Sequence, residues 1–328
     1  MGLRRKKRLF GAGLGAGLLG AFFLALRYAI SPIAKARVPD TISPAIFRTK
    51  VIHTSLGQVV YHESGTGPTV VFVHGICPGA SSYEWSKVYP QFTASHRVLA
   101  PDLIGFGESA RPDANLTAAD YARSLAEFIR GTCDEPATVV ASGLGAGLSV
   151  LLASQHPEVV KQLFLWMPTG CTDRRAREVS LGRRIMSSMP MVHRFMYKNY
   201  ESSNTAVKAW LTIHGFADAG RITDETVEVY ATCARQYGAE HAIRSLYSGR
   251  LNVDLEQRLP TVSQPMTIMW PEQTGEGRPE AATRLQKLAP ASRLVLLPGL
   301  SQLAAVEGAG EIAALLTEEL DPGPKVVR

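Results

Sequence analysis

The stretch VVASGLGAGLSV, residues 139–150, decides the fold of this chain. An apolar run that begins at Thr138 ends here in small residues, and a helix-like pattern follows at once. We therefore predict a buried strand that turns sharply into a helix. The residue at the tip of the predicted turn is Gly143, which has no side chain and offers only its backbone to any chemistry.

Strand and helix patterns alternate on both sides of this turn. KVIHT (50–54) and QVVYHES (58–64) predict an opening hairpin. Further strands are expected at 69–74, 97–102, 138–142, 162–167, 266–270 and 293–298, and helices near 84–94, 118–131, 145–156, 278–289 and 309–319. The alternation predicts an α/β fold class with a doubly wound, mostly parallel sheet that is covered on both faces.

The alternation stops between Pro168 and Pro265, where the sequence is helical in character. On a doubly wound sheet such an insertion lies over the C-terminal ends of the strands, where these folds bind ligands. The predicted domains are a basic N-terminus with an anchor helix at 1–30, a linker at 31–50, a core of 51–170 and 264–320, a helical cap at 171–263 and a tail at 321–328.

Within the predicted cap, GRRIMSSMPMVHRFMYKNY (182–200) combines methionines and aromatic residues with basic ones. Two interpretations stay open. The segment is either an ordinary amphipathic helix with a solvated basic side, or a face that contacts lipid headgroups or a protein partner.

The N-terminus carries a membrane signal. RRKKR (4–8) precedes LFGAGLGAGLLGAFFLAL (9–26), a long run without a charge. As a helix this run would span roughly 27 Å, which is close to the hydrocarbon thickness of a bilayer. We predict a single-pass anchor with a cytoplasmic N-terminus and a soluble domain on the extracytoplasmic side. A cleaved signal peptide and a buried soluble helix are the alternatives.

Glycines in this run are spaced for helix packing. The spacing G-x-x-x-G lets a second helix approach closely, so an integral-membrane partner is expected on this face. The glycines concerned are Gly11, Gly13, Gly15 and Gly17.

Charge and cysteine content argue against nucleic-acid binding and against a zinc site. Residues 1–40 carry a net charge of +7 and the whole chain carries +6, which leaves −1 for the rest. A nearly neutral body lacks the basic face that nucleic-acid binding requires. The four cysteines have no zinc-type spacing. We expect no nucleic-acid partner, no metal and no cofactor.

The chain resembles α/β-hydrolases of the helical-cap type, the group that holds esterases, epoxide hydrolases and haloalkane dehalogenases. The segments that carry the resemblance are VVFVHGICPGASSYEW (70–85), RVLAPDLIGFGESARP (97–112), VVASGLGAGLSVLLASQHPEVV (139–160) and SGRLNVDLEQRLPTVSQPMTIMWPE (248–272). The resemblance implies a nucleophile at the tip of a G-x-S-x-G elbow, a histidine base and a carboxylate that orients the histidine.

Each of these three positions departs from the pattern of the family. Gly143 occupies the place of the nucleophile, and Ser142 is one residue early, where its hydroxyl should point away from the pocket. Gln302 takes the place of the histidine in LPGLSQ, and an amide cannot act as a base near neutral pH. Thr274 takes the place of the aspartate, with Asp173 as a weak alternative acid.

Parts of a pocket remain recognisable in the sequence. His74, Gly75 and Ile76 match the oxyanion turn of the family, and Ile76 and Leu144 would donate their backbone N–H groups. His74 can equally be a packed histidine that joins a strand to a loop.

The sequence thus favours a non-catalytic, membrane-anchored protein with an α/β-hydrolase fold, serving as an accessory subunit of a membrane complex or as a ligand binder. An active hydrolase for a small or lipid-like ester, with non-standard catalytic residues, is the alternative.

Overall fold

The computed structural model describes residues 42–170, 181–272 and 279–320. Within these residues, eight strands form one sheet in the order β1-β2-β4-β3-β5-β6-β7-β8. The strands are β1 (Arg48–Thr54), β2 (Gly57–Ser64), β3 (Thr69–Val73), β4 (Arg97–Pro101), β5 (Ala137–Ser142), β6 (Val160–Trp166), β7 (Met266–Pro271) and β8 (Arg293–Leu297). β1 and β2 pair antiparallel, as do β2 and β4, and the remaining pairs are parallel. The predicted hairpin and the mostly parallel sheet are therefore confirmed.

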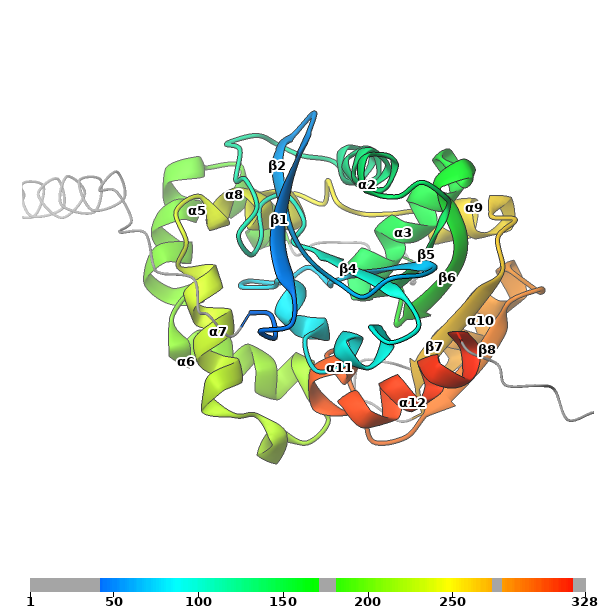
Figure 1. Ribbon diagram of the computed structural model, residues 1–328. Helices are drawn as coiled ribbons and strands as arrows, with labels where there is room; N and C mark the ends of the chain where they lie inside the picture. Colours follow the sequence, from blue (N-terminus) through cyan, green and yellow to red (C-terminus); the bar gives the residue numbers. More distant parts are fainter. Residues whose placement is uncertain (1–41, 171–180, 273–278, 321–328) are drawn as a thin grey trace, which may run out of the picture.

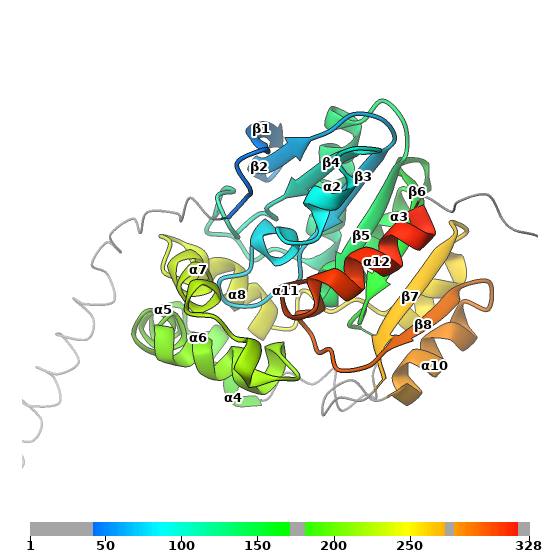
Figure 2. The ribbon, with the colours of Figure 1, turned by 60° about the horizontal axis from the view of Figure 1, so that its bottom comes forward.

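Helices cover both faces of this sheet. Figures 1 and 2 show α2 and α3 on one face and α12 on the other. The helices of the core are α2 (Ala118–Thr132), α3 (Gly143–Gln155), α10 (Pro279–Leu288), α11 (Ala304–Glu307) and α12 (Ala309–Leu320), with a 3-10 turn η3 (Pro157–Val159). α2 begins with a capping box, in which Thr117 and Asp120 satisfy each other's backbone N–H groups.

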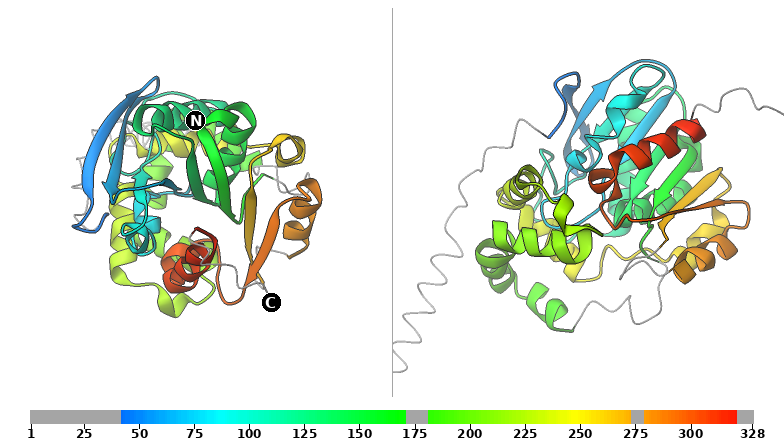
Figure 3. Two further views of the ribbon diagram at one scale, coloured as in Figure 1. Left: turned by 45° about the vertical axis from the view of Figure 1, so that its right-hand side comes forward. Right: turned by 90° about the horizontal axis from the view of Figure 1, so that it is seen from below.

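A second group of helices lies to one side of the sheet, as the predicted cap requires (Figure 3). This group contains α4 (Leu181–Ser187), α5 (Pro190–Met196), η4 (Tyr197–Glu201), α6 (Asn204–Trp210), η5 (Leu211–Gly215), η6 (Ala219–Arg221), α7 (Asp224–Ala234) and α8 (Ala239–Tyr247). The predicted cap boundary at residue 263 is too late. α9 (Leu255–Arg258) and η7 (Leu259–Thr261) pack against α3 in the core, because the side chains of Leu255 and Leu259 are buried there.

Two further predictions differ from the structure. The prediction of one helix near 84–94 is wrong, since this segment forms two separate 3-10 turns, η1 (Ser82–Trp85) and η2 (Tyr89–Phe92). Pro90 lies in the first turn of η2 and has no N–H to donate, so an α-helix cannot run through it. The linker expected at 31–50 ends too late, because β1 already begins at Arg48 and the Phe47 ring is buried 4.5 Å from the Tyr89 ring.

Several predictions lie outside the described residues. They concern the anchor at 9–26 with its glycines, the tail at 321–328, Asp173 and Thr274. In the part of the chain that the structure describes, no helix is both long and apolar enough to cross a bilayer.

Candidate functional site

The elbow between β5 and α3 has the backbone of a nucleophile turn. β5 is buried along its whole length between β3 and β6, and it ends at Ser142 in extended conformation. Gly143 then adopts a positive φ of 51° and starts α3. Glycine adopts this left-handed conformation without the strain that a Cβ atom introduces. The turn is thus placed at the C-terminal edge of the sheet without any reactive side chain at its tip.

Gln302 lies directly in front of this tip. A Cβ atom built on Gly143 would lie 3.8 Å from the Nε2 atom of Gln302, with open space otherwise. The loop that carries Gln302 is held by Trp166, whose indole Nε1 donates to the carbonyl oxygen of Ser301 at 3.0 Å. The fold therefore brings two of the three triad-equivalent positions together, although they lie in distant parts of the sequence. Neither position can accept a proton near neutral pH.

The two candidate acid positions, Thr274 and Asp173, lie outside the described residues. Glu272, which ends the described part of this loop, is exposed, and its backbone N–H donates to the carbonyl oxygen of Leu297 at 2.8 Å. Its backbone thus extends the pairing of β7 with β8, and the exposed carboxylate is a surface group.

Ser142 is engaged by a buried carboxylate that the sequence interpretation missed. The Ser142 hydroxyl donates to Oε1 of Glu84, and the backbone N–H of Gly75 donates to Oε2 of Glu84 at 2.7 Å. Both side chains are buried. Glu84 thus links the elbow at Ser142 to the loop after β3 at Gly75. A charged residue inside the apolar aromatic run SYEW was the signal that could have found it.

Burial gives Glu84 an unusual titration. Desolvation raises the pKa of Glu84 from 4.5 to about 7, although the hydrogen bonds from Ser142 and Gly75 act in the opposite direction. Between these two pH values the folded protein holds a proton that the unfolded chain releases. The free energy of unfolding therefore falls as pH rises through this window, and the loss is complete above pH 7.

We expect Glu84→Gln to remove this pH dependence, because the amide does not titrate. Its oxygen can accept from the Gly75 N–H group, and its NH2 group can donate to the Ser142 hydroxyl, which then acts as the acceptor. Relative to the wild type, the variant should gain on the order of 3 kcal/mol in free energy of unfolding at pH 8 and gain little at pH 4. Urea unfolding of the full chain in detergent at both pH values measures the difference. Glu272→Gln, at an exposed position, is the matched control and should keep the pH dependence of the wild type. If the free energy of unfolding changed equally with pH in both variants, Glu84 would not be the group that causes the dependence.

His74 has a structural role in this arrangement. Its Nδ1–H donates to the carbonyl oxygen of Gly75 at 2.6 Å, and its Nε2 accepts from the backbone N–H of Leu103 at 3.0 Å. Burial lowers the pKa of His74, so the ring is neutral. These bonds join the loop after β3 to the loop after β4 and leave neither ring nitrogen for a substrate.

A cavity of about 300 Å³ opens beside Gln302, between the core and the cap. Its lining combines apolar side chains with basic and hydrogen-bonding ones. The lining residues are Ile76, Cys77, Pro78, Arg183, Trp210, His214, Leu246, Tyr247 and Gln302. Burial raises the pKa of Cys77 well above its ordinary value, so this thiol stays protonated and is a poor nucleophile. The cavity can hold a ligand but presents no activated nucleophile among these residues.

The cap is fastened to the loop of Gln302 by Glu307. Oε1 of Glu307 accepts the backbone N–H groups of Ala217 and Asp218 at 2.8 Å, and Oε2 accepts that of Ser301 at 2.9 Å. The Ser301 hydroxyl also donates to the carbonyl oxygen of His214 at 3.2 Å. His214 and Gln302 therefore keep their places in the cavity by contacts that no local sequence pattern indicates.

One cluster of metal-ligating side-chain types occurs in the described residues: His62, Asp102 and Glu108, whose ligand atoms lie within 4.8 Å of one another. Both oxygens of Asp102 already accept backbone N–H groups, from Ser82 and from Glu108, each at 2.7 Å. These contacts order the segment PDLIGFGES, so the cluster has a structural explanation.

Comparison with known proteins agrees with the fold. The sequence profile of the alpha/beta hydrolase fold family matches residues 68–192. An uncharacterized protein of Mycobacterium tuberculosis is 26% identical over 236 residues, which are 70% of this chain and 67% of that protein. The 2-(acetamidomethylene)succinate hydrolase of Mesorhizobium japonicum is 25% identical over 72% of this chain and 82% of its own length. The 2-hydroxymuconate semialdehyde hydrolase of a Pseudomonas species is 36% identical, but over 33% of this chain and 39% of that enzyme.

Solved structures show the same architecture. An epoxide hydrolase superposes with a TM-score of 0.72 at 16% identity, covering 84% of this chain and 99% of that chain. A serine hydrolase involved in carbazole degradation superposes with a TM-score of 0.70 at 20% identity, covering 84% of this chain and all of that chain. The elbow, the sheet order and the two superpositions show that the chain has the α/β-hydrolase fold. Over residues 68–192 its sequence is similar to the family of that fold.

Proposed function

We propose that this protein is a membrane-anchored, non-hydrolytic α/β-hydrolase-like protein that binds a small ligand, either as a ligand binder in its own right or as an accessory subunit of a membrane complex. The observation that carries the proposal is the pair of Gly143 and Gln302 at the elbow. Acyl transfer in this fold needs a nucleophile and a base at these two positions, and loss of either generally costs orders of magnitude in rate.

The cavity beside Gln302 supports a ligand-binding role. Ile76, Trp210 and Leu246 can contact an apolar body, while Arg183 and His214 can contact an anionic or hydrogen-bonding group. Among the relatives, one enzyme is named for acting on a substituted succinate, which is an acidic molecule. A compact, partly apolar ligand with a carboxylate is therefore the class that we propose for this pocket.

The membrane anchor rests on the uncharged run at 9–26 and its preceding basic block. We propose a single pass with a cytoplasmic N-terminus, an extracytoplasmic body and an integral-membrane partner at Gly11, Gly13, Gly15 and Gly17. Gentle detergent extraction from native membranes tests the partner: a stoichiometric complex supports it, and a lone monomer contradicts it.

The test of the missing chemistry is direct. We expect the purified full chain to show no turnover of activated esters above the Gly143→Ala variant, and no labelling by a serine-reactive phosphonate. Ser142→Ala should behave identically, because its hydroxyl is held by Glu84. Robust turnover that disappears in Ser142→Ala would overturn the proposal and favour the alternative, an active hydrolase with non-standard residues.

A further inference from the structure

Helices α4 and α5 of the cap bury polar side chains and expose large apolar ones, which is the opposite of an ordinary helix of a soluble protein. The side chain that α4 buries is that of Ser187, and the side chain that α5 buries is that of His193. Nε2 of His193 lies 3.0 Å from the carbonyl oxygen of Glu240, so a polar contact fixes α5 to α8. A surface helix of a soluble protein buries its apolar stripe instead. Several large apolar side chains of α4 and α5 are left exposed, although Met186, Phe195 and Met196 are half-buried.

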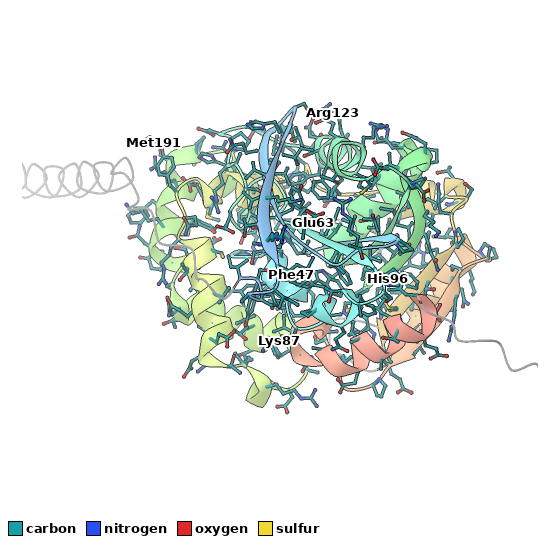
Figure 4. The ribbon with its side chains drawn as sticks, viewed as in Figure 1. Phe47, Glu63, Lys87, His96, Arg123 and Met191 are labelled. Carbon is teal, nitrogen blue, oxygen red and sulfur yellow. The ribbon has the colours of Figure 1, made fainter. Side chains whose placement is uncertain are left out.

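These side chains form a patch that we call the apolar face. It consists of large apolar residues on and between the two helices: Leu181 (73% exposed), Ile185 (50%), Met189 (52%), Met191 (45%) and Val192 (46%). Met191 lies at the outer edge of the cap in Figure 4. Single exposed apolar residues are ordinary, but such a group on two adjoining helices marks an interaction site.

A basic pocket borders the apolar face. We call it the arginine pocket, and its volume is about 450 Å³. It is lined by Asn115, Arg184, Ser187, Ser188, Pro190, Arg244, Ser248 and Arg250. Arg184, Ser187, Ser188 and Pro190 belong to the same segment that carries the apolar face, so one stretch of chain contributes to both.

Three arginine side chains and the Asn115 amide are the hydrogen-bond donors in the lining of this pocket. The hydroxyls of Ser187, Ser188 and Ser248 donate to carbonyl oxygens of the helical turn that precedes each of them. Arg244 contacts Asp113 through Nη2 at 2.6 Å, and its buried Nε has no hydrogen-bond partner among the described residues. The pocket is lined by three guanidinium groups, and the ion pair that the described residues show among them is that of Arg244 with the exposed carboxylate of Asp113. This balance favours an anion, and phosphate oxygens match the fork of a guanidinium group.

We propose that α4 and α5 dock on an anionic phospholipid bilayer, with lipid phosphates in the arginine pocket and the apolar face at the headgroup boundary. Charge complementarity argues for this occupant, because a basic side next to exposed Leu, Ile, Met and Val side chains is the pattern of interfacial segments. The inference rests on the proposed function only for the anchor, which would hold the body near a membrane, and not on the absence of hydrolysis.

The experiment uses the full chain in three settings: detergent micelles, nanodiscs of phosphatidylcholine, and nanodiscs of phosphatidylcholine with phosphatidylglycerol. Hydrogen exchange of peptides covering residues 181–196 is measured by mass spectrometry. We expect the slowest exchange in the anionic nanodiscs, an intermediate rate in phosphatidylcholine and the fastest rate in micelles.

Matched double variants separate the two parts of the surface. Arg184→Gln/Arg250→Gln should reduce docking about 25-fold, since each arginine near an anionic surface contributes roughly fivefold. Lys87→Gln/Lys161→Gln removes the same charge from exposed positions elsewhere and should have no such effect. Ile185→Ser/Met191→Ser should abolish protection in both nanodiscs, whereas Val51→Ser/Leu296→Ser, also at exposed positions, should not.

Three outcomes would overturn the inference. Equal protection in micelles and in both nanodiscs would mean that another segment of this chain covers the apolar face. Protection by inorganic phosphate without lipid would make the arginine pocket a site for a free anion. Rapid exchange in every setting would leave the surface without the proposed occupant. These hydrogen-exchange measurements do not depend on ester turnover. A failure of membrane docking can therefore be told apart from a failure of the proposed function.

Discussion

Gly145→Ala is expected to lower the free energy of unfolding by about 3 kcal/mol or more, because the new methyl group has no room. A Cβ atom on Gly145 would lie 2.2 Å from the carbonyl oxygen of His74 and 3.3 Å from Cγ1 of Val73. The first of these contacts is with backbone, which cannot rotate away. The first turn of α3 would have to move off the loop that follows β3, and the elbow would separate from the oxyanion turn.

Gly143→Ala is the matched control for this prediction, since it adds the same atom earlier in the same turn. Its Cβ atom would meet Nε2 of Gln302 at an ordinary contact distance of 3.8 Å, so the cost is conformational, about 1–2 kcal/mol for an L-residue at positive φ. Urea unfolding of both variants in detergent gives the two values. Equal destabilisation would contradict the close approach of α3 to His74.

Gly143→Ser/Gln302→His is expected to react with a serine-directed phosphonate about 100-fold faster than the wild type or either single variant. The side chain of residue 302 already lies 3.8 Å from the Cβ position of residue 143. A serine hydroxyl one bond further out would come within reach of an imidazole there, which can accept its proton.

The rate of phosphonate labelling, followed by intact-protein mass spectrometry, measures this gain. Gly143→Ser alone tests the hydroxyl without a base, and Gln302→His alone tests the base without a hydroxyl. A double variant that folds and yet stays as inert as both single variants would show that the elbow has lost its geometry as well as its side chain.

Much of the core could be predicted from the sequence, because strands and helices leave patterns that are visible over a few neighbouring residues. Continuous apolar runs such as TVVFV mark strands buried on both faces, and helical periodicity marks the segments between them. The elbow was predictable because a strand, small residues and a helix follow one another directly in the stretch 139–150. One failure was local, since Pro90 breaks the helix expected near 84–94. The linker and cap boundaries failed for a tertiary reason, because Phe47 packs on Tyr89 and α9 packs on α3.

The site itself depended on contacts between distant segments. Glu84 and Ser142 are 58 residues apart, and their hydrogen bond exists only because β3 and β5 are neighbours in the sheet. The raised pKa of Glu84 has the same origin, since desolvation depends on everything packed around the carboxyl group. His214 and Gln302 share a cavity because Glu307 fastens the cap to the loop after β8.

What the sequence determined by itself was the order of strands and helices and the identity of the residues at the elbow: Gly143 at the tip, Ser142 beside it and Gln302 in place of a base. Periodicity and turn chemistry act over a few residues, so one chain suffices to read them. Which polar groups are buried together, and which apolar side chains of α4 and α5 are left facing outward, only the tertiary structure decided. Burial is a property of the packed whole, and the hydrophobic effect acts on the surface that remains after every segment has found its neighbours.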